Sequence, residues 1–260
     1  MTADLLPLGL AMFSGGIVAL LLTLFGGGGS VLAVPLLLYV VGVADPHVAI
    51  GVSAAGVAMN ALTALAGHAR AGHVRWPCAS LFAVTGAAGA WFGSTLAKAI
   101  DGHQLLLIFA VAMAAVGLSM LRHRVTAVRP EPTLNWAMSP RVSLAGAGVG
   151  SAAGFFGIGG GFLIVPGLMA STGMSLATAQ ATSLLSVAAF GATTAGNYAL
   201  SGWVDPGLVL AMTVGGLVGT ATGLPLARRL GANAALGRTL FAGLILVVAV
   251  YVAIRAILAQ

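Results

Sequence analysis

Charged residues are scarce in this chain of 260 amino acids. Asp, Glu, Lys and Arg together make up only 6% of it, whereas 59% of the residues are hydrophobic. A soluble globular domain carries roughly 25% charged residues, so these few charges exclude a water-facing surface. The segment Val142–Val204 contains no charged residue at all, and one membrane-spanning helix needs only about 20 apolar residues. The composition therefore predicts a membrane protein with several spans, and the continuous apolar blocks argue against a β-barrel.

Several kinds of functional residue are also missing. Cys78 is the single cysteine, which excludes an internal disulfide and a multi-cysteine metal site. The five histidines lack metal-ligand spacing, so we expect no metal and no cofactor. No acidic side chain stands in the middle of an apolar segment, which argues against a carboxylate proton relay. The N-terminus, Met1–Pro7, has no basic stretch of the kind that precedes a cleavable signal, so we expect the first helix to be retained.

One glycine-rich motif occurs twice. Leu24–Pro35 reads LFGGGGSVLAVP and Phe155–Pro166 reads FFGIGGGFLIVP. After a one-residue gap the register continues through pairs such as Ser53/Ser183, Thr63/Thr193 and Gly93/Gly223. A register held over this length argues against chance similarity between two stretches rich in Gly, Ala and Leu.

The chain is accordingly predicted to be all-α and to consist of two repeats, residues 1–121 and 142–260, joined by a linker over 122–141. The linker is rich in Pro and Arg, which is typical of an exposed loop. Each repeat contains five apolar segments, which predicts about 8–10 membrane helices, some of them broken at glycines or re-entrant. The predicted segments are 6–25, 29–43, 47–68, 77–97, 105–121, 142–156, 160–173, 177–200, 207–227 and 235–257.

The basic residues predict how the chain is oriented. An odd number of crossings per repeat would place the second repeat upside down in the membrane. If the linker is cytoplasmic, nine of the 11 basic residues lie on the cytoplasmic side, and only Lys98 and Arg255 lie opposite. This is the asymmetry of the positive-inside rule in a plasma membrane or bacterial inner membrane. It predicts an inverted repeat, and it explains the net charge of +6 without nucleic-acid binding.

The glycine runs are candidate substrate-binding segments. Each glycine in a helix costs about 0.5–1 kcal/mol relative to Ala, so the helices should break there and resume near Ser30 and Gly161. The first N–H groups of the resumed helix have no intrahelical partner and favour an anion. The alternative is that the glycines only allow close helix packing. The candidate residues in these runs are Gly28, Gly29, Ser30, Gly159, Gly160 and Gly161.

Polar side chains in the third segment of each repeat are further candidates. Ser53 and Asn60 are seven residues apart and share one helical face. An amide in hydrocarbon needs partners, which favours a substrate or pore role for Asn60 and Asn197, whereas an isolated Ser or Thr more often bonds to its own or a neighbouring helix. The candidate residues in these segments are Ser53, Asn60, Thr182, Ser183 and Asn197.

Two other functions are disfavoured. The glycine runs lack the Gly-Lys-Ser/Thr of a phosphate-binding loop. Gly51–Ala54 faintly resembles the serine motif of rhomboid-like proteases, with His68 as the base. Ser53 and His68 would stand about 22 Å apart along one helix and would not share a proton, so we expect no enzyme.

The paired motifs resemble the TauE/SafE sulfite exporter family. The resemblance is carried by FGGGGSVLAVP and FGIGGGFLIVP, by AIGVS and AQATS, which end at Ser53 and Ser183, and by GHV and GWV, which begin at Gly72 and Gly202. It implies a secondary transporter that exports a small anion, typically sulfite or an organosulfonate, by alternating access. An anion channel of the same architecture is the alternative. The expected partners are the small anionic substrate and membrane lipid.

Overall fold

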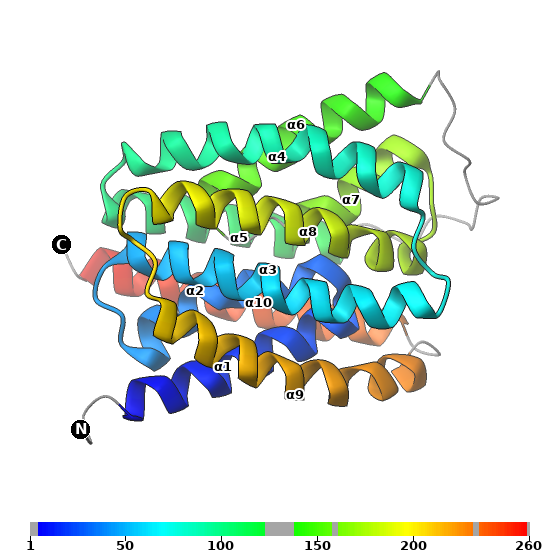
Figure 1. Ribbon diagram of the computed structural model, residues 1–260. Coiled ribbons are helices and arrows are strands. Elements are labelled where there is room, and N and C mark those ends of the chain that lie inside the picture. Colours follow the sequence, from blue (N-terminus) through cyan, green and yellow to red (C-terminus); the bar gives the residue numbers. More distant parts are fainter. Residues whose placement is uncertain (1–4, 123–137, 158–160, 231–233, 259–260) are drawn as a thin grey trace.

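The structure is a computed structural model that describes residues 5–122, 138–157, 161–230 and 234–258 (Figure 1). Within these ranges the chain is helical, and no strand occurs in them. In chain order the elements are α1 (Leu5–Phe25), the 3₁₀ helix η1 (Gly26–Leu32), α2 (Ala33–Leu36), the π-helix η2 (Leu37–Val41), α3 (Pro46–Arg70), α4 (Trp76–Lys98), α5 (Gly102–Arg122), α6 (Ser139–Phe156), α7 (Gly161–Thr172), α8 (Leu176–Ala199), α9 (Pro206–Leu230) and α10 (Ala234–Leu258).

The helices form a membrane bundle. Among the described residues, α1, α3, α8 and the segment Pro206–Ala227 of α9 are long and apolar enough to cross a bilayer. Large apolar side chains also cover the outside: Val84 is 71% exposed, Leu144 is 75% exposed and Phe92 is 67% exposed. In water such a surface would be unfavourable, whereas in a membrane it faces lipid. The all-helical membrane class expected from the composition is confirmed.

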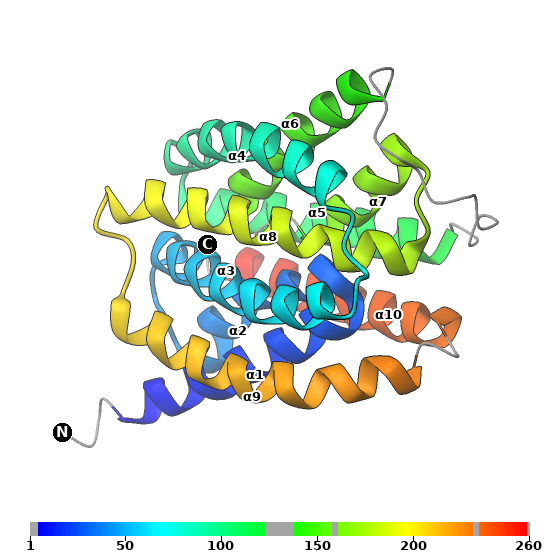
Figure 2. The same cartoon turned by 45° about the vertical axis from the view of Figure 1, so that its right-hand side comes forward.

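Aspartates cap helices at one end of the bundle. Figures 1 and 2 show that α1 begins and α10 ends at one end, whereas α5 ends and α6 begins at the other. At the first end, Asp45 precedes α3 and its Oδ1 accepts from His47 N at 2.8 Å. Asp205 precedes α9 at the same end, and its Oδ1 accepts from Gly207 N at 2.8 Å. A carboxylate at a helix N-terminus satisfies backbone donors and complements the helix dipole, so these aspartates fix where the helices start.

Helices of the two repeats pack against each other in matched pairs. In α4, a Cβ on Gly89 would collide with the carbonyl oxygen of Ala147 in α6. In α9, a Cβ on Gly219 would collide with the carbonyl oxygen of Gly16 in α1. The repeat register pairs Gly89 with Gly219 and Gly16 with Ala147, so equivalent positions make equivalent contacts in α4–α6 and α1–α9. Small residues allow these backbones to approach closely, which is the packing role expected of many of the glycines.

The remaining long helices also pack in pairs, one from each half of the chain. α3 packs on α8 in the middle of the molecule, and α5 packs on α10. The central pair is buried through residues such as Val52, Val57, Leu184 and Val187, each with no exposed surface. The two-repeat organisation and the orientation of the repeats in a membrane both stay predictions.

Most predicted segments match a helix, but the segment predicted over 29–43 does not form one regular helix. Instead η1, α2 and η2 follow α1 without interruption and end at Gly42, which has φ 84°. The glycines form a tight 3₁₀ helix that lies against α1, where a Cβ on Gly29 would collide with the backbone of Leu21 and Leu22. The expected restart of the helix near Ser30 is therefore not observed.

Candidate substrate-binding site

The two glycine-rich segments lie in contact in the middle of the fold. η1 of the first repeat packs against α7 of the second. α6 ends at Phe156, and Gly157 follows it in the left-handed conformation with φ 66°. α7 begins at Gly161, as the sequence predicts. Gly28 lies within η1, whereas Gly159 and Gly160 lie outside the described residues.

Gly157 is fixed by its surroundings. Its N–H donates to the carbonyl oxygen of Gly154 at 3.3 Å, which closes the last turn of α6. A Cβ at this position would collide with the Ile50 side chain of α3. The positive φ and the contact with Ile50 both require glycine, so α3 holds the place at which the chain leaves α6.

The third helix of one repeat contacts the glycine-rich segment of the other. Ser53 of α3 is fully buried, and its Oγ donates to the carbonyl oxygens of Ile50 at 2.9 Å and Gly157 at 3.0 Å. On the other side α8, which carries Ser183, packs against η1, in which Ser30 is fully buried. The structure thus brings the glycine-rich segments and the polar faces of α3 and α8 together in crossed pairs.

The two crossed pairs lie at different depths. Ser53 is seven residues after the start of α3, and Ser183 is seven residues after the start of α8. Each serine is therefore about 10 Å along its own helix. The two helices start at opposite ends of the bundle (Figure 1). The candidate residues accordingly form two half-sites rather than one cluster.

Thr182 connects its half-site to one end of the bundle. Its Oγ1 accepts from Arg75 N at 3.2 Å, in the connection between α3 and α4. Ser183, the next residue, donates through Oγ to the carbonyl oxygen of Gln180 at 2.8 Å. Thr182 therefore couples α8 to a basic loop, which is a contact that sequence spacing does not reveal.

Asn60 lies apart from both half-sites, between α1, α3 and α9. Its Nδ2 donates to the carbonyl oxygen of Gly15 at 3.4 Å, and its Oδ1 is buried with no hydrogen-bond partner among the described residues. The repeat register places Asn60 opposite Phe190, and both side chains pack on equivalent glycines, Gly216 and Gly86. A buried acceptor without a donor is costly, so this oxygen suits a water or a protonated ligand.

Asn197 lies in a polar contact between α4 and α8. Its Nδ2 donates to Ser94 Oγ at 2.7 Å, Thr95 Oγ1 at 2.8 Å and the carbonyl oxygen of Trp91 at 3.2 Å. Its Oδ1 accepts from Lys98 Nζ at 2.7 Å. The same Nζ donates to the Asn197 carbonyl oxygen at 3.1 Å and to Ser201 Oγ at 3.1 Å. The amide therefore joins the C-terminal ends of α4 and α8 in this conformation.

Sequence reasoning placed Lys98 only on the non-cytoplasmic side of the membrane and missed this network. The only available signal was its position directly after an apolar segment, next to Ser94 and Thr95. A lysine there can reach the free carbonyl groups at the end of a neighbouring helix, where a positive charge is favoured by the helix dipole.

A bundle of apolar helices with paired, glycine-broken segments at its centre defines a multi-pass membrane protein. The family model described as "Sulfite exporter TauE/SafE" matches residues 11–252. The chain therefore belongs to the TauE/SafE family and is a membrane transporter of the cell membrane.

Curated relatives carry names of the same class. Two proteins called "Probable membrane transporter protein", from two strains of Xylella fastidiosa, are each 48% identical over 240 residues, which is 92% of this chain and 92% of the relative. The "Probable membrane transporter protein YdhB" of Bacillus subtilis is 27% identical over 76% of this chain and 80% of its own length. No solved structure matches the chain.

Proposed function

We propose that this chain is a secondary transporter that exports sulfite or an organosulfonate by alternating access. The observation that carries the proposal is the crossed pairing at the centre, where Ser53 of the first repeat bonds to Gly157 of the second and α8 contacts η1. Family membership supports the substrate class. The proposed substrate residues are those of the two half-sites. One is Ser53 beside Gly157, and the other is Thr182 and Ser183 on α8 beside η1.

The chemistry of the half-sites suits an oxyanion. α7 begins at Gly161 in the interior of the bundle, and the first N–H groups of a helix have no intrahelical acceptor. They therefore favour negative charge without a fixed cation. The Ser53 hydroxyl holds the Gly157 carbonyl in place, and Thr182 carries a second hydroxyl on α8, which packs against η1. A sulfonate or sulfite offers several acceptor oxygens to the N–H groups at the start of α7.

Two half-sites at different depths favour a carrier over a channel. If the contact between α3 and Gly157 and the contact between α8 and η1 open alternately during transport, each half-site opens toward one side of the membrane in turn. Export also agrees with the electrical gradient. Moving one negative charge out of a cell with a negative interior releases about 2.3 kcal/mol per 100 mV.

The purified protein in liposomes tests the proposal. We expect saturable efflux of labelled sulfite or sulfoacetate, little efflux of sulfate, and accelerated exchange when unlabelled substrate is present on the opposite side. Efflux that rises linearly with concentration and shows no exchange would identify the alternative, an anion channel. Efflux of none of these anions would contradict the proposal.

The central contact is tested with Ser53→Ala. This change removes the hydroxyl that holds Gly157, and the loss of one neutral hydrogen bond corresponds to about a two- to tenfold change in an equilibrium constant. We expect the apparent substrate affinity to fall by this amount while membrane insertion is retained. Ser80→Ala is the matched control, because within the described part of the chain the exposed Ser80 hydroxyl bonds only to Pro77 O of its own helix, at 3.2 Å. Equal affinity of both variants and the parent would remove Ser53 from the site.

A further inference from the structure

A pocket of about 440 Å³ opens at the end of the bundle where α10 ends. It lies between η2 and the connection that follows it, the start of α5, and the end of α10. Its volume is in the range of sites for small organic ligands. Neither Ser53 nor Ser183 lines it, so the pocket is distinct from both half-sites.

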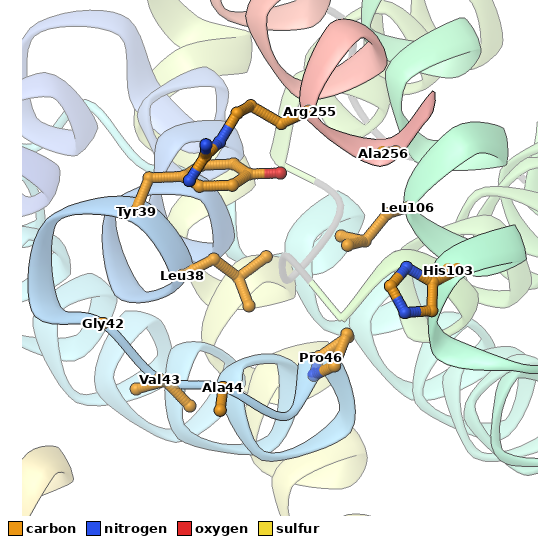
Figure 3. A pocket seen from close by; sticks show the side chains of 10 residues that line it. All are labelled: Leu38, Tyr39, Gly42, Val43, Ala44, Pro46, His103, Leu106, Arg255 and Ala256. Atoms are coloured by element: carbon orange, nitrogen blue, oxygen red, sulfur yellow. The ribbon is translucent and has the colours of Figure 1, made fainter. Parts of the chain in front are cut away.

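The pocket combines two polar edges with an apolar wall. Figure 3 shows the Arg255 guanidinium over the Tyr39 ring on one side and the His103 imidazole across from it, with Leu38 and Leu106 between them. The centre of the guanidinium is 5.7 Å from the centre of the Tyr39 ring. Stacking of this kind fixes the plane of an arginine and leaves its N–H groups available for a ligand.

The acidic groups near the pocket are directed elsewhere. None of the described residues that line it is acidic. Asp101 precedes α5, and its Oδ2 accepts from His103 N at 3.0 Å. Asp45 precedes α3 and accepts from His47 N at 2.8 Å. Both carboxylates cap helix N-termini, where the helix dipole offsets part of their charge, and Arg255 remains the charged group of the pocket wall.

We infer that this pocket binds an oxyanion that carries an organic group, such as a sulfonate. Arg255 contacts the oxyanion, because guanidinium binds planar pairs of oxygen atoms in two-point fashion. His103 contacts the opposite side of the ligand, and the Leu38 and Leu106 side chains cover its apolar part. Because the predicted orientation places this end outside the cytoplasm, the pocket serves as the release site for the exported anion. That role rests on the transport function proposed above.

A phospholipid headgroup offers the same chemistry as a free sulfonate. Tyr39 and Arg255 stand at one end of an apolar bundle, where aromatic rings and long basic side chains meet the headgroups of a membrane. The test therefore needs one arm for a free anion and one for a lipid. We argue for the free anion, because the pocket also has a wall on the α5 side, formed by His103 and Leu106.

The test measures binding of sulfoacetate, sulfite and phosphate to the full-length protein in neutral detergent. We expect Arg255→Gln to weaken sulfoacetate binding by about ten- to a hundredfold, since a hydrogen bond to a charged group is lost. His103→Gln should weaken it less. Arg70→Gln is the matched control: it removes the same charge from an exposed residue at the other end of α3, and we expect unchanged binding.

The outcomes separate the pocket from the transport function. Equal binding by the parent and by Arg255→Gln would overturn the pocket, and efflux by both in liposomes would leave the proposed function intact. Absence of binding to the parent would overturn the pocket in the same way. In the lipid arm, native mass spectrometry in phosphatidylglycerol or phosphatidylcholine reports retained lipid. The parent could retain phosphatidylglycerol that Arg255→Gln loses, and bind sulfoacetate only weakly. This result would overturn the free anion and assign the pocket to a lipid headgroup.

Discussion

Gly157 shows how one backbone conformation connects the repeats. Its φ of 66° turns the chain out of α6, and its missing side chain makes room for Ile50 of α3. Its carbonyl oxygen then accepts the Ser53 hydroxyl at 3.0 Å. Gly157 thus sets the direction in which the chain leaves α6, and it also contacts α3 of the other repeat.

We expect Gly157→Ala to destabilise the protein by at least about 1–2 kcal/mol, because a left-handed conformation costs this much for a residue with a Cβ. The contact with Ile50 adds to the cost. Thermal unfolding in detergent, followed by circular dichroism, measures the effect. Gly148→Ala within α6 is the control: among the described residues nothing lies within 4 Å of its Cβ position, so Ala should leave stability equal or slightly higher. Equal stability of the two variants would contradict this role of Gly157.

Asn197 is the residue for which structure and sequence suggest different roles. The sequence favours a substrate contact, whereas the structure engages both ends of the amide in the contact between α4 and α8. We expect Asn197→Ala to lower the free energy of unfolding by about 1–3 kcal/mol, because Ser94 Oγ and Lys98 Nζ lose a partner. Thermal unfolding and substrate affinity should be measured on the same preparation, and affinity per folded molecule should be unchanged.

The exposed Thr222 is a suitable control for this comparison. Among the residues that the structure describes, its Oγ1 donates only to Val218 O at 3.0 Å and Gly219 O at 3.1 Å of its own helix, so Thr222→Ala should change neither quantity. Unchanged stability of Asn197→Ala together with weaker substrate binding would return Asn197 to the substrate site.

At the scale of the elements, apolar length predicted where most helices begin and end. The segment predicted over 47–68 is α3, Pro46–Arg70, and the one over 177–200 is α8, Leu176–Ala199. These boundaries are set locally, by Asp45 and Ser175 at the N-caps and by loops that contain the left-handed Gly72 and Gly202. Such signals are present in the sequence around each helix and need no tertiary contact.

Contacts between elements could not be predicted from the sequence in the same way. The glycines of η1 predicted a break, but the 3₁₀ form of that segment depends on its packing against α1 at Gly29. The crossed contact between Ser53 and Gly157 joins residues 104 positions apart. The Arg255 pocket likewise joins residues 38–46 and 103–106 with residues 255 and 256. Periodicity and spacing describe one helix at a time, so they identified the polar residues without their partners.

At the scale of the whole molecule, helices far apart in the sequence pack in pairs that are equivalent under the predicted repeat. α1 lies on α9 and α6 lies on α4, which are equivalent pairs under the repeat register. The ends of the bundle also differ, with Asp45, Asp101 and Asp205 capping helices at one of them. These aspartates lie at the end predicted to face away from the cytoplasm, and the opposite end carries most of the basic residues.

The inverted orientation is testable at a pair of equivalent positions. Ala71 precedes Gly72 in the first repeat and Ser201 precedes Gly202 in the second, and both glycines have φ 73°. If the repeats are inverted, these identical turns face opposite sides of the membrane. In a background with Cys78→Ala, which removes the only native thiol, Ala71→Cys should react with an impermeant thiol reagent only from the cytoplasmic side. Ser201→Cys should react only from the other side.

Labelling of intact cells measures reaction from outside the cell, and labelling of inverted vesicles measures reaction from the cytoplasmic side. Each variant is its own control, because it should react in one preparation and not in the other. The positive-inside rule makes the direction specific: Ala71 lies between Arg70 and Arg75, whereas Ser201 contacts Lys98 and lies near Asp205. Reaction of both variants in the same preparation would mean that the repeats are parallel, and the two half-sites would then not exchange access by symmetry. Reaction of each variant in the preparation opposite to its prediction would keep the inverted repeat, reverse the whole molecule in the membrane, and place the Arg255 pocket on the cytoplasmic side.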